Sequence, residues 1–237
     1  MTSQVDLHRA ALRSRLDWTD YLAANSGLPG PRGNLELVAA CGEEADLQRA
    51  VALIATGDEF STVCGLVALG RHFGLGDDTH VGVLHDLASD HRWRVREGVA
   101  MAVQRASDAD LARGFELAER WARDVDPLVR RAAVAAVCEP RLLRTAAFAE
   151  RALTLLDLVT ADLTRLPSDG RRAPAVRTLR QALGYGWSVA IAARPRQGLA
   201  RFDRLRASND PDVAWIVREN LKKARLRRLI APPEIDG

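Results

Sequence analysis

The stretch DVDPLVRRAAVAAV, residues 124–137, carries the pattern that decides the fold. Asp126 is a favoured N-cap residue, and Pro127 follows it at the first helical position, where a missing N–H breaks no helical hydrogen bond. Small and aliphatic residues then recur at three- and four-residue spacing, as they do on the buried face of an amphipathic helix. The stretch therefore predicts a helix that begins at Pro127 and buries a face of Ala and Val.

The same frame occurs at four other places in the chain. A Pro or an aromatic residue opens each segment, and Val or Thr follows two residues later. The segments are FSTVCGLVALGRHF (60–73), WRVREGVAMAVQRA (93–106), PAVRTLRQALGYGW (174–187) and PDVAWIVRENLKKA (211–224). Gly65, Gly98 and Ala132 hold equivalent places and are separated by 33 and 34 residues. A repeat of this length indicates stacked structural units.

Further amphipathic segments lie between these helices, so each unit is expected to be a helix pair. They are residues 47–55, 80–89, 111–124, 147–166 and 199–207, and an opening pair is expected over roughly 4–25 and 33–42. The sequence therefore predicts an all-α protein, a right-handed α-solenoid of about six helix pairs. We expect a single domain over residues 1–237, with a capping pair at 1–44, repeats at 45–226 and a tail at 227–237.

These segments resemble the HEAT-repeat family of armadillo-like solenoids. The resemblance is carried by residues 124–137 and by NDPDVAWIVRENL (209–221), and more loosely by DHRWRVREGVAMAV (90–103). It implies that the second helix of each pair lines a concave face. It also implies that Arg96, Arg130 and Arg177 form a structural ladder between repeats and do not contact a ligand.

The composition excludes several classes of protein. No apolar run approaches the ~20 residues that a membrane-spanning helix needs, and the first residues lack the apolar core of a signal peptide, so we expect a soluble, cytoplasmic protein. Cys41, Cys64 and Cys138 are far apart among apolar neighbours, which favours reduced core thiols. The histidines show no H-E-x-x-H motif, and the only lysines, Lys222 and Lys223, follow no glycine-rich loop. We therefore expect no metal, no cofactor and no catalytic residue.

The charge of the chain is unevenly distributed. Residues 1–120 carry 12 Arg and 18 Asp or Glu, whereas residues 121–237 carry 22 Arg or Lys and 13 Asp or Glu. Much of the excess lies in DPDVAWIVRENLKKARLRR, residues 210–228, which is expected to form one helix with an apolar and a basic side. A basic surface of this kind attracts an acidic protein or nucleic acid.

Positions two, five and nine residues after each framing Val fall on one side of the helix and define a variable stripe. The stripe reads Glu97, Ala100, Gln104; Arg131, Val134, Cys138; Thr178, Gln181, Tyr185; Trp215, Arg218, Lys222. In GYGWSVAIAARP (184–195), the glycines either expose Tyr185 and Trp187 at a kink or permit close helix packing. The candidate binding residues are Arg131, Gln181, Tyr185, Trp187, Trp215, Arg218, Lys222, Lys223 and Arg225.

The main functional hypothesis is a non-catalytic binding module that engages an acidic protein or nucleic acid through this basic, concave C-terminal face. A second follows from a resemblance to bacterial HEAT-like alkylpurine DNA glycosylases, carried by Trp93, Glu97 and WIVRE (215–219). It implies DNA repair, with Glu97 stabilising a cationic sugar and Trp93 holding the alkylated base. The doubled tryptophan followed by two spaced aspartates of those enzymes is absent here. A third hypothesis is a scaffold that binds a protein partner by apolar contacts.

Overall fold

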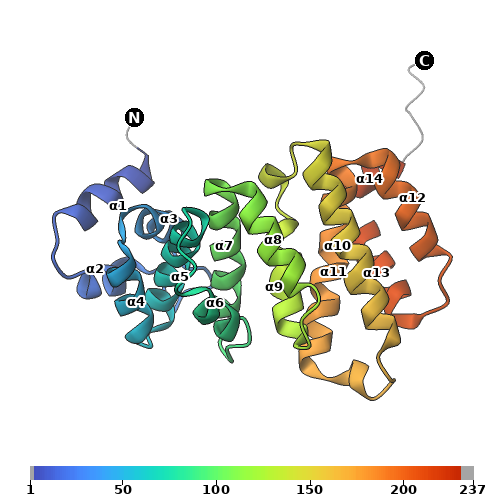
Figure 1. Ribbon diagram of the computed structural model, residues 1–237, viewed down its shortest axis with the longest axis horizontal. Helices are drawn as coiled ribbons and strands as arrows, with labels where there is room; N and C mark the ends of the chain where they lie inside the picture. The colour runs from blue at the N-terminus through green and yellow to red at the C-terminus, as the bar shows by residue number, and fades with distance from the viewer. Residues whose placement is uncertain (1–2, 231–237) are drawn as a thin grey trace. The chain divides into compact units, whose positions relative to one another are not determined.

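The computed structural model describes residues 3–230, and within this range the protein is all-helical (Figure 1). Fourteen α-helices and two short 3₁₀ helices follow one another, with no strand between residues 3 and 230. The predicted all-α class is therefore confirmed. None of the helices in the described range is long and apolar enough to cross a membrane.

The chain divides into two compact units, Met1–Leu117 and Ala118–Gly237. The helices of the N-terminal unit are α1 (Gln4–Arg13), α2 (Thr19–Asn25), α3 (Leu35–Glu44), α4 (Leu47–Ala55), α5 (Glu59–Gly74), α6 (Val81–Leu87) and α7 (Trp93–Ala109). Helix α8 (Leu111–Trp121) crosses the division. Helix α5 is the centre of the N-terminal unit and packs against α3, α4 and α7.

Glycine permits the close approach of α5 and α7. A Cβ atom on Gly70 would overlap the backbone carbonyl of Ala102, so only glycine permits this approach. The core around it consists largely of small and aliphatic side chains, including Leu66, Val99 and Ala106. Such side chains allow helix axes to come close, which explains how an aromatic-poor sequence still fills a core.

The C-terminal unit is built around one long helix. It contains α9 (Pro127–Val137), α10 (Ala146–Arg165), α11 (Pro174–Ala193), α12 (Pro195–Arg206), α13 (Pro211–Leu221) and α14 (Ala224–Ile230), with 3₁₀ helices at Pro140–Leu142 and Gly170–Arg172. Helix α11 contacts every other α-helix of this list. A site on α11 is therefore held in place by several neighbours.

The helix starts expected from the Asp-Pro pairs are confirmed. The Asp126 carboxylate accepts a hydrogen bond from the Leu128 amide at 2.7 Å, and Pro127 is the first residue of α9. Asp210 accepts from the amides of Asp212 and Val213 at 2.9 and 3.2 Å. Local capping chemistry therefore places both helix starts.

Two predicted helix segments were too long. The segment 4–25 is two helices, because the buried Trp18 turns inward and its Nε1 donates to the Leu12 carbonyl at 3.0 Å. The segment 210–228 is also two helices, because a turn at Lys222 and Lys223 separates α13 from α14 and lets Leu226 reach the core. In both places burial of one apolar side chain outweighs continuation of the helix. Residues 231–237 of the expected tail lie outside the described residues.

The arginines that the HEAT resemblance assigns to a ladder act more locally. Arg96 donates to the carbonyls of Asp90 and His91 at 2.6 and 3.0 Å, and Arg130 donates to the Asp124 carbonyl. Each of these two therefore holds the loop before its own helix. Arg177 is exposed, and the ion pair between neighbouring helices at this level joins Arg180 on α11 to Asp212 on α13.

The three cysteines are free and buried, as expected from their apolar neighbours. Burial raises the pKa of the Cys138 thiol to about 12. A thiol that stays protonated is a poor nucleophile. The cysteines therefore belong to the core.

Candidate functional site

Tyr185 lies on α11 between two glycines that have packing roles. A Cβ on Gly184 would lie 2.8 Å from the Trp215 ring, and one on Gly186 would lie 2.9 Å from the Cys138 sulfur. The glycines thus let α13 and α9 approach α11, which supports the close-packing interpretation of GYGW. Tyr185 itself is 43% exposed.

A buried asparagine fixes α13 against α11. The Asn220 side chain donates to the carbonyls of Leu183 and Ile216 at 2.9 and 2.8 Å and accepts from the Ser188 amide at 2.8 Å. The sequence analysis did not identify this residue. Its position four residues after Ile216, on the apolar side of the helix, could have indicated a buried, hydrogen-bonded Asn. Because Asn220 is fully buried, it determines which way the exposed side of α13 faces.

Two cations of the segment after α13 lie against Tyr185. Arg225 donates from Nη2 to the Tyr185 hydroxyl at 2.8 Å, and its guanidinium carbon lies 5.0 Å from the ring centroid. The Lys223 Nζ lies 5.6 Å from the same centroid. The turn between α13 and α14 brings both side chains to a ring about 40 residues earlier in the chain.

Four more cations are exposed on the same two helices and the turn between them. These are Arg218, Lys222, Arg227 and Arg228, and with Lys223, Arg225 and Tyr185 we call them the basic surface. Lys222 contacts Glu219 at 2.6 Å and holds the pKa of that carboxyl below its usual value, and Lys223 and Arg218 act in the same direction. Within residues 3–230, Arg218, Arg227 and Arg228 form no ion pair. The surface thus carries a clear excess of positive charge.

Some predicted binding residues lie elsewhere. Trp187 is fully buried and donates to Thr160 Oγ1 at 3.2 Å, so its assignment as a binding residue is wrong. Trp215 is half-buried, with the Arg180 guanidinium 4.8 Å from its ring centroid and Gly184 against the ring, so it packs α13 against α11. Gln181 is exposed one turn before Tyr185 and extends the surface.

The predicted stripe is not continuous. Ala100, Val134 and Cys138 are buried, because α7 and α9 are covered on the side that the stripe was expected to leave open. Arg131 is half-buried on α9, and it precedes Cys138 by seven residues, about 10 Å along a helix axis. Arg131 lies on α9, and the basic surface is formed by α13, α14, the turn between them and Tyr185, so Arg131 is not one of its residues.

The N-terminal unit contains a second candidate, a cavity of about 470 Å³ that we call the Trp93 pocket. Trp93, Glu97 and Met101 line it from successive turns of α7, and Phe60 and Val63 line it from α5. The other walls are Leu35, Glu36 and Val38 of α3 and residues of the preceding loop, Leu28, Pro31, Arg32 and Gly33, with Glu59 and Arg94 at the side. Trp93 and Glu97, the residues of the glycosylase hypothesis, therefore line one pocket, and the loop between α2 and α3 forms part of its wall.

The charges of the Trp93 pocket are partly neutralised within it. Arg94 pairs with Glu59 at 3.2 Å, donates to the Gly30 carbonyl at 3.1 Å, and lies 4.6 Å from the Trp93 ring centroid. Glu36 is exposed and Glu97 is half-buried. Arg94 is thus a fixed part of the wall, and Glu59 neutralises its charge.

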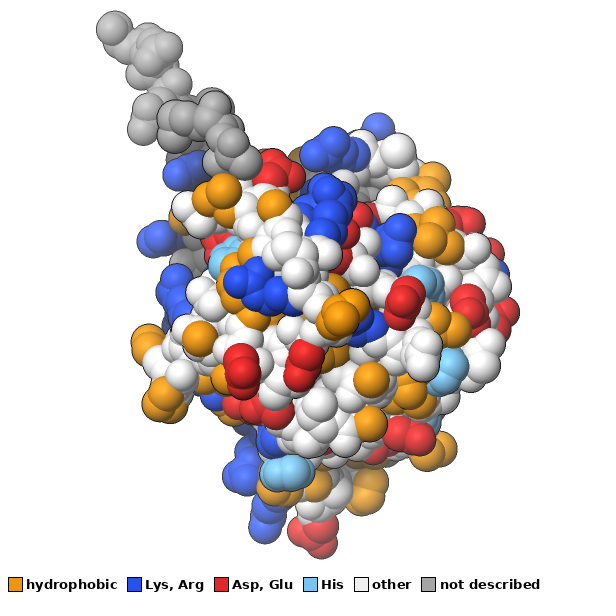
Figure 2. Space-filling view, turned by 90° about the vertical axis from the view of Figure 1, so that its left-hand side faces the viewer, with side chains coloured by type: hydrophobic (Ala, Val, Ile, Leu, Met, Phe, Trp, Pro, Cys, Tyr) orange, Lys and Arg blue, Asp and Glu red, His pale blue; other side chains and the backbone are white. Residues whose placement is uncertain are grey.

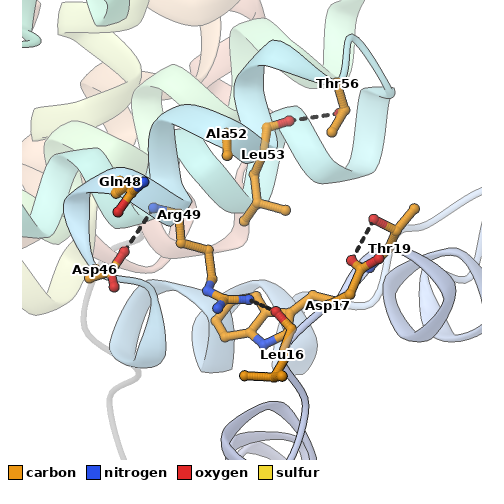
Figure 3. A pocket seen from close by; sticks show the side chains of 10 residues that line it. Leu16, Asp17, Thr19, Asp46, Gln48, Arg49, Ala52, Leu53 and Thr56 are labelled. Carbon is orange, nitrogen blue, oxygen red and sulfur yellow. Dashed lines mark hydrogen bonds between the residues drawn. The ribbon is translucent and has the colours of Figure 1, made fainter.

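A smaller pocket lies between α4 and the loop that joins α1 to α2 (Figure 3). The contacts of Arg49 and Asp17 in this pocket are made within the protein. The Arg49 guanidinium lies 4.5 Å above the Trp18 ring and donates to the Leu16 carbonyl at 3.0 Å. Asp17 accepts from the Thr19 amide and hydroxyl at 2.9 and 2.8 Å. Its charged groups are therefore used by the fold.

Figure 2 shows the face of the N-terminal unit that carries α1 and α2. Acidic, basic and hydrophobic side chains are interspersed on it, and neither sign of charge dominates.

Comparison of the chain with protein-family models, curated proteins and solved structures finds no match. Any functional conclusion therefore depends on the geometry of the basic surface and the Trp93 pocket.

Proposed function

We propose that this protein is a non-catalytic, cytoplasmic binding module that engages nucleic acid through its basic surface, without a cofactor. The observation that carries the proposal is the exposed Tyr185 ring with Arg225 and Lys223 beside it. We further propose that the helix pairs form a right-handed HEAT-type solenoid. The packing in chain order of α3, α5 and α7, and of α9, α11 and α13, supports that arrangement.

Single-stranded nucleic acid suits this surface better than an acidic protein. Clustered Lys and Arg side chains gain affinity for phosphates by releasing counterions. An exposed aromatic ring adds a stacking platform for an unpaired base, worth about 1–3 kcal/mol per base. The carboxylates of an acidic protein would use the cations alone and leave Tyr185 without a role.

The test measures affinity by fluorescence anisotropy for labelled single-stranded DNA, the matching duplex and polyglutamate, at several salt concentrations. We expect the single strand to bind best, and its affinity to fall with salt in proportion to the phosphates neutralised. Tyr185→Ala should weaken binding of the single strand about tenfold or more and change the affinity for polyglutamate little, whereas Tyr185→Phe should retain the stacking and bind the single strand more tightly than Tyr185→Ala. Preference for polyglutamate would instead identify an acidic protein partner, and absence of salt-sensitive binding to all three probes would refute the proposal.

DNA repair is the second candidate, because Trp93 and Glu97 line one pocket. The surroundings oppose it, since the N-terminal unit that holds the pocket carries 11 Arg against 17 Asp or Glu, and this excess of negative charge repels the phosphates of a duplex. We expect the wild-type protein to release no base from alkylated duplex DNA. Base release that Glu97→Gln abolishes, with DNA affinity retained, would instead make the protein a glycosylase.

A further inference from the structure

We infer that Gln181 contacts the edge of a base stacked on Tyr185 and gives the protein a preference for adenine in a single strand. The inference rests on the proposed function, because it assigns a base-contacting residue to the edge of the same basic surface. It goes beyond that function by naming the base that the site selects.

Three exposed side chains of helix α11 follow one another at intervals of about one turn. Arg177, Gln181 and Tyr185 are exposed, whereas Leu179 and Leu183 between them are buried. Residues four apart lie on the same side of a helix, with their Cβ atoms about 5–6 Å apart. The three side chains therefore form a row that extends about 12 Å along the axis of α11.

The side-chain amide of Gln181 is available to a ligand. Within residues 3–230 it forms no hydrogen bond with the protein. The other carboxamide near this part of α11, that of Asn220, is buried and donates to and accepts from backbone groups. A carboxamide places an acceptor oxygen beside an NH₂ donor. Gln181 can therefore donate to and accept from the same partner.

Tyr185 holds a stacked base within reach of this amide. The Cα–Cβ bonds of an α-helix tilt toward its N-terminus, so the Tyr185 side chain is directed toward the turn that carries Gln181. The hydrogen bond from Arg225 to the Tyr185 hydroxyl, at 2.8 Å, restrains the ring. A base is larger than a phenol ring, so its edge extends past Tyr185 and can meet the Gln181 amide.

Adenine fits a carboxamide on two of its edges. Its N6 amino group donates to the glutamine oxygen, while N1 or N7 accepts from the glutamine NH₂ group, and glutamine is a common partner of adenine. An unpaired base exposes both edges. Guanine has two acceptors at N7 and O6, so it fits Gln181 on its Watson–Crick edge alone, and a pyrimidine has one such edge and a smaller face to stack on Tyr185.

Arg177 supplies a cation at the far end of the row. It is exposed and forms no ion pair within the described range, 3–230. A contact with a phosphate positions a strand but carries no information about its sequence. Arg177 and Gln181 should therefore affect binding in different ways, which allows the base contact to be tested separately from charge.

The experiment measures the affinity of the full-length protein for short, labelled oligothymidine strands in which the central base is adenine, guanine, cytosine or thymine. Fluorescence anisotropy at low salt gives the four affinities. We expect the strand with adenine to bind about fivefold more tightly than the all-thymine strand, which is the lower end of the discrimination by a bidentate base contact. The lower end is expected because Gln181 is open to water.

Three variants separate the base contact from general effects. Gln181→Met keeps the length of the side chain and removes its donor and acceptor, so it should abolish the adenine preference and change the all-thymine affinity by less than about twofold. Arg177→Ala should weaken all four strands by a similar factor, about threefold, and keep the preference. Gln197→Met makes the same change on α12 of the same unit and should bind like the wild type. Circular dichroism confirms that each variant is folded.

The outcomes distinguish this inference from the proposed function. Equal affinity for all four strands, or an adenine preference that Gln181→Met retains, would overturn the inference and leave single-strand binding in place. Preference for another base that Gln181→Met abolishes would refute adenine as the selected base. Absence of salt-sensitive binding to every strand would refute the inference together with the proposed function.

Discussion

The two units each expose one aromatic ring with an arginine against it, yet the two sites have opposite electrostatic character. In the N-terminal unit the arginine over Trp93 is Arg94, and Glu59 neutralises it at 3.2 Å. In the C-terminal unit the arginine at Tyr185 is Arg225, which donates to the Tyr185 hydroxyl and has Lys223 as its neighbour on the ring. An arginine against an exposed aromatic ring is therefore neutralised in the N-terminal unit and adds to a local excess of positive charge in the C-terminal unit.

The units also differ in overall charge. Residues 1–117 have a net charge of −6, whereas residues 118–237, with 23 Arg or Lys against 14 Asp or Glu, have a net charge of +9. Long-range fields of this kind steer oppositely charged partners toward each unit. The two units therefore favour partners of opposite charge.

The largest expected effect concerns packing in the N-terminal unit. Gly70→Ala should lower the free energy of unfolding by about 3 kcal/mol or more, because its Cβ must push α5 away from the Ala102 carbonyl. Gly82→Ala is the control, since nothing lies near a Cβ at that exposed helical position and alanine should stabilise by about 0.5–1 kcal/mol. Urea unfolding measures both. Equal effects of the two changes would contradict the close α5–α7 approach.

The counterpart in the C-terminal unit is Asn220→Ala. It leaves the Ser188 amide and the Leu183 carbonyl without the partners that Asn220 provides, which should cost about 2–3 kcal/mol. Hydrogen exchange should show reduced protection of the backbone amides in α11 and α13 for Asn220→Ala, and in α5 and α7 for Gly70→Ala. If each change loosens both units equally, the two units unfold as one and the distinction between them fails.

A smaller effect is expected from the basic surface. Arg218→Glu with Lys222→Glu should reduce single-stranded DNA affinity about tenfold, since both side chains are exposed cations one turn apart at the end of α13. The control, Arg172→Glu with Arg196→Glu, makes the same change in net charge at exposed positions on other elements of the same unit. Anisotropy at low salt compares the two. Equal losses would mean that net charge, and not the basic surface, determines binding.

The smallest effect is a pH dependence in the N-terminal unit. The side-chain hydrogen bond from Arg13 lowers the pKa of Glu44 below its ordinary value of 4.5, burial opposes this, and Arg9 adds to the lowering. A depressed pKa means that the stabilisation is present above about pH 4.5 and is lost as the pH falls through the lower folded-state pKa. Glu44→Gln should therefore cost about 1 kcal/mol at pH 7 and progressively less in acid, measured by urea unfolding. A cost that does not change with pH would contradict this account.

Much of the fold could be predicted from local sequence. The Asp-Pro pairs placed the starts of α9 and α13, and helical spacing of small residues predicted α4 as residues 47–55 and α5 and α7 to within a few residues. These features depend on groups within one or two turns of each other, so a sequence contains the necessary information. The exposed, basic character of Arg218 and Lys222 was predicted for the same reason.

The tertiary structure decided which side chains are exposed to solvent and which are buried. Tyr185 and Trp187 are two residues apart on α11, but Trp187 is buried and donates to Thr160 of α10, whereas Tyr185 remains exposed. The break between α13 and α14 likewise depends on Leu226 finding space in the core, and Trp93 meets Leu35 only because α3, α5 and α7 pack together. Helical periodicity predicts which side of its helix a side chain lies on. Whether that side is buried depends on helices that are distant in sequence. The sequence by itself therefore determined the helices and their charge, and only long-range packing decided the basic surface and the Trp93 pocket.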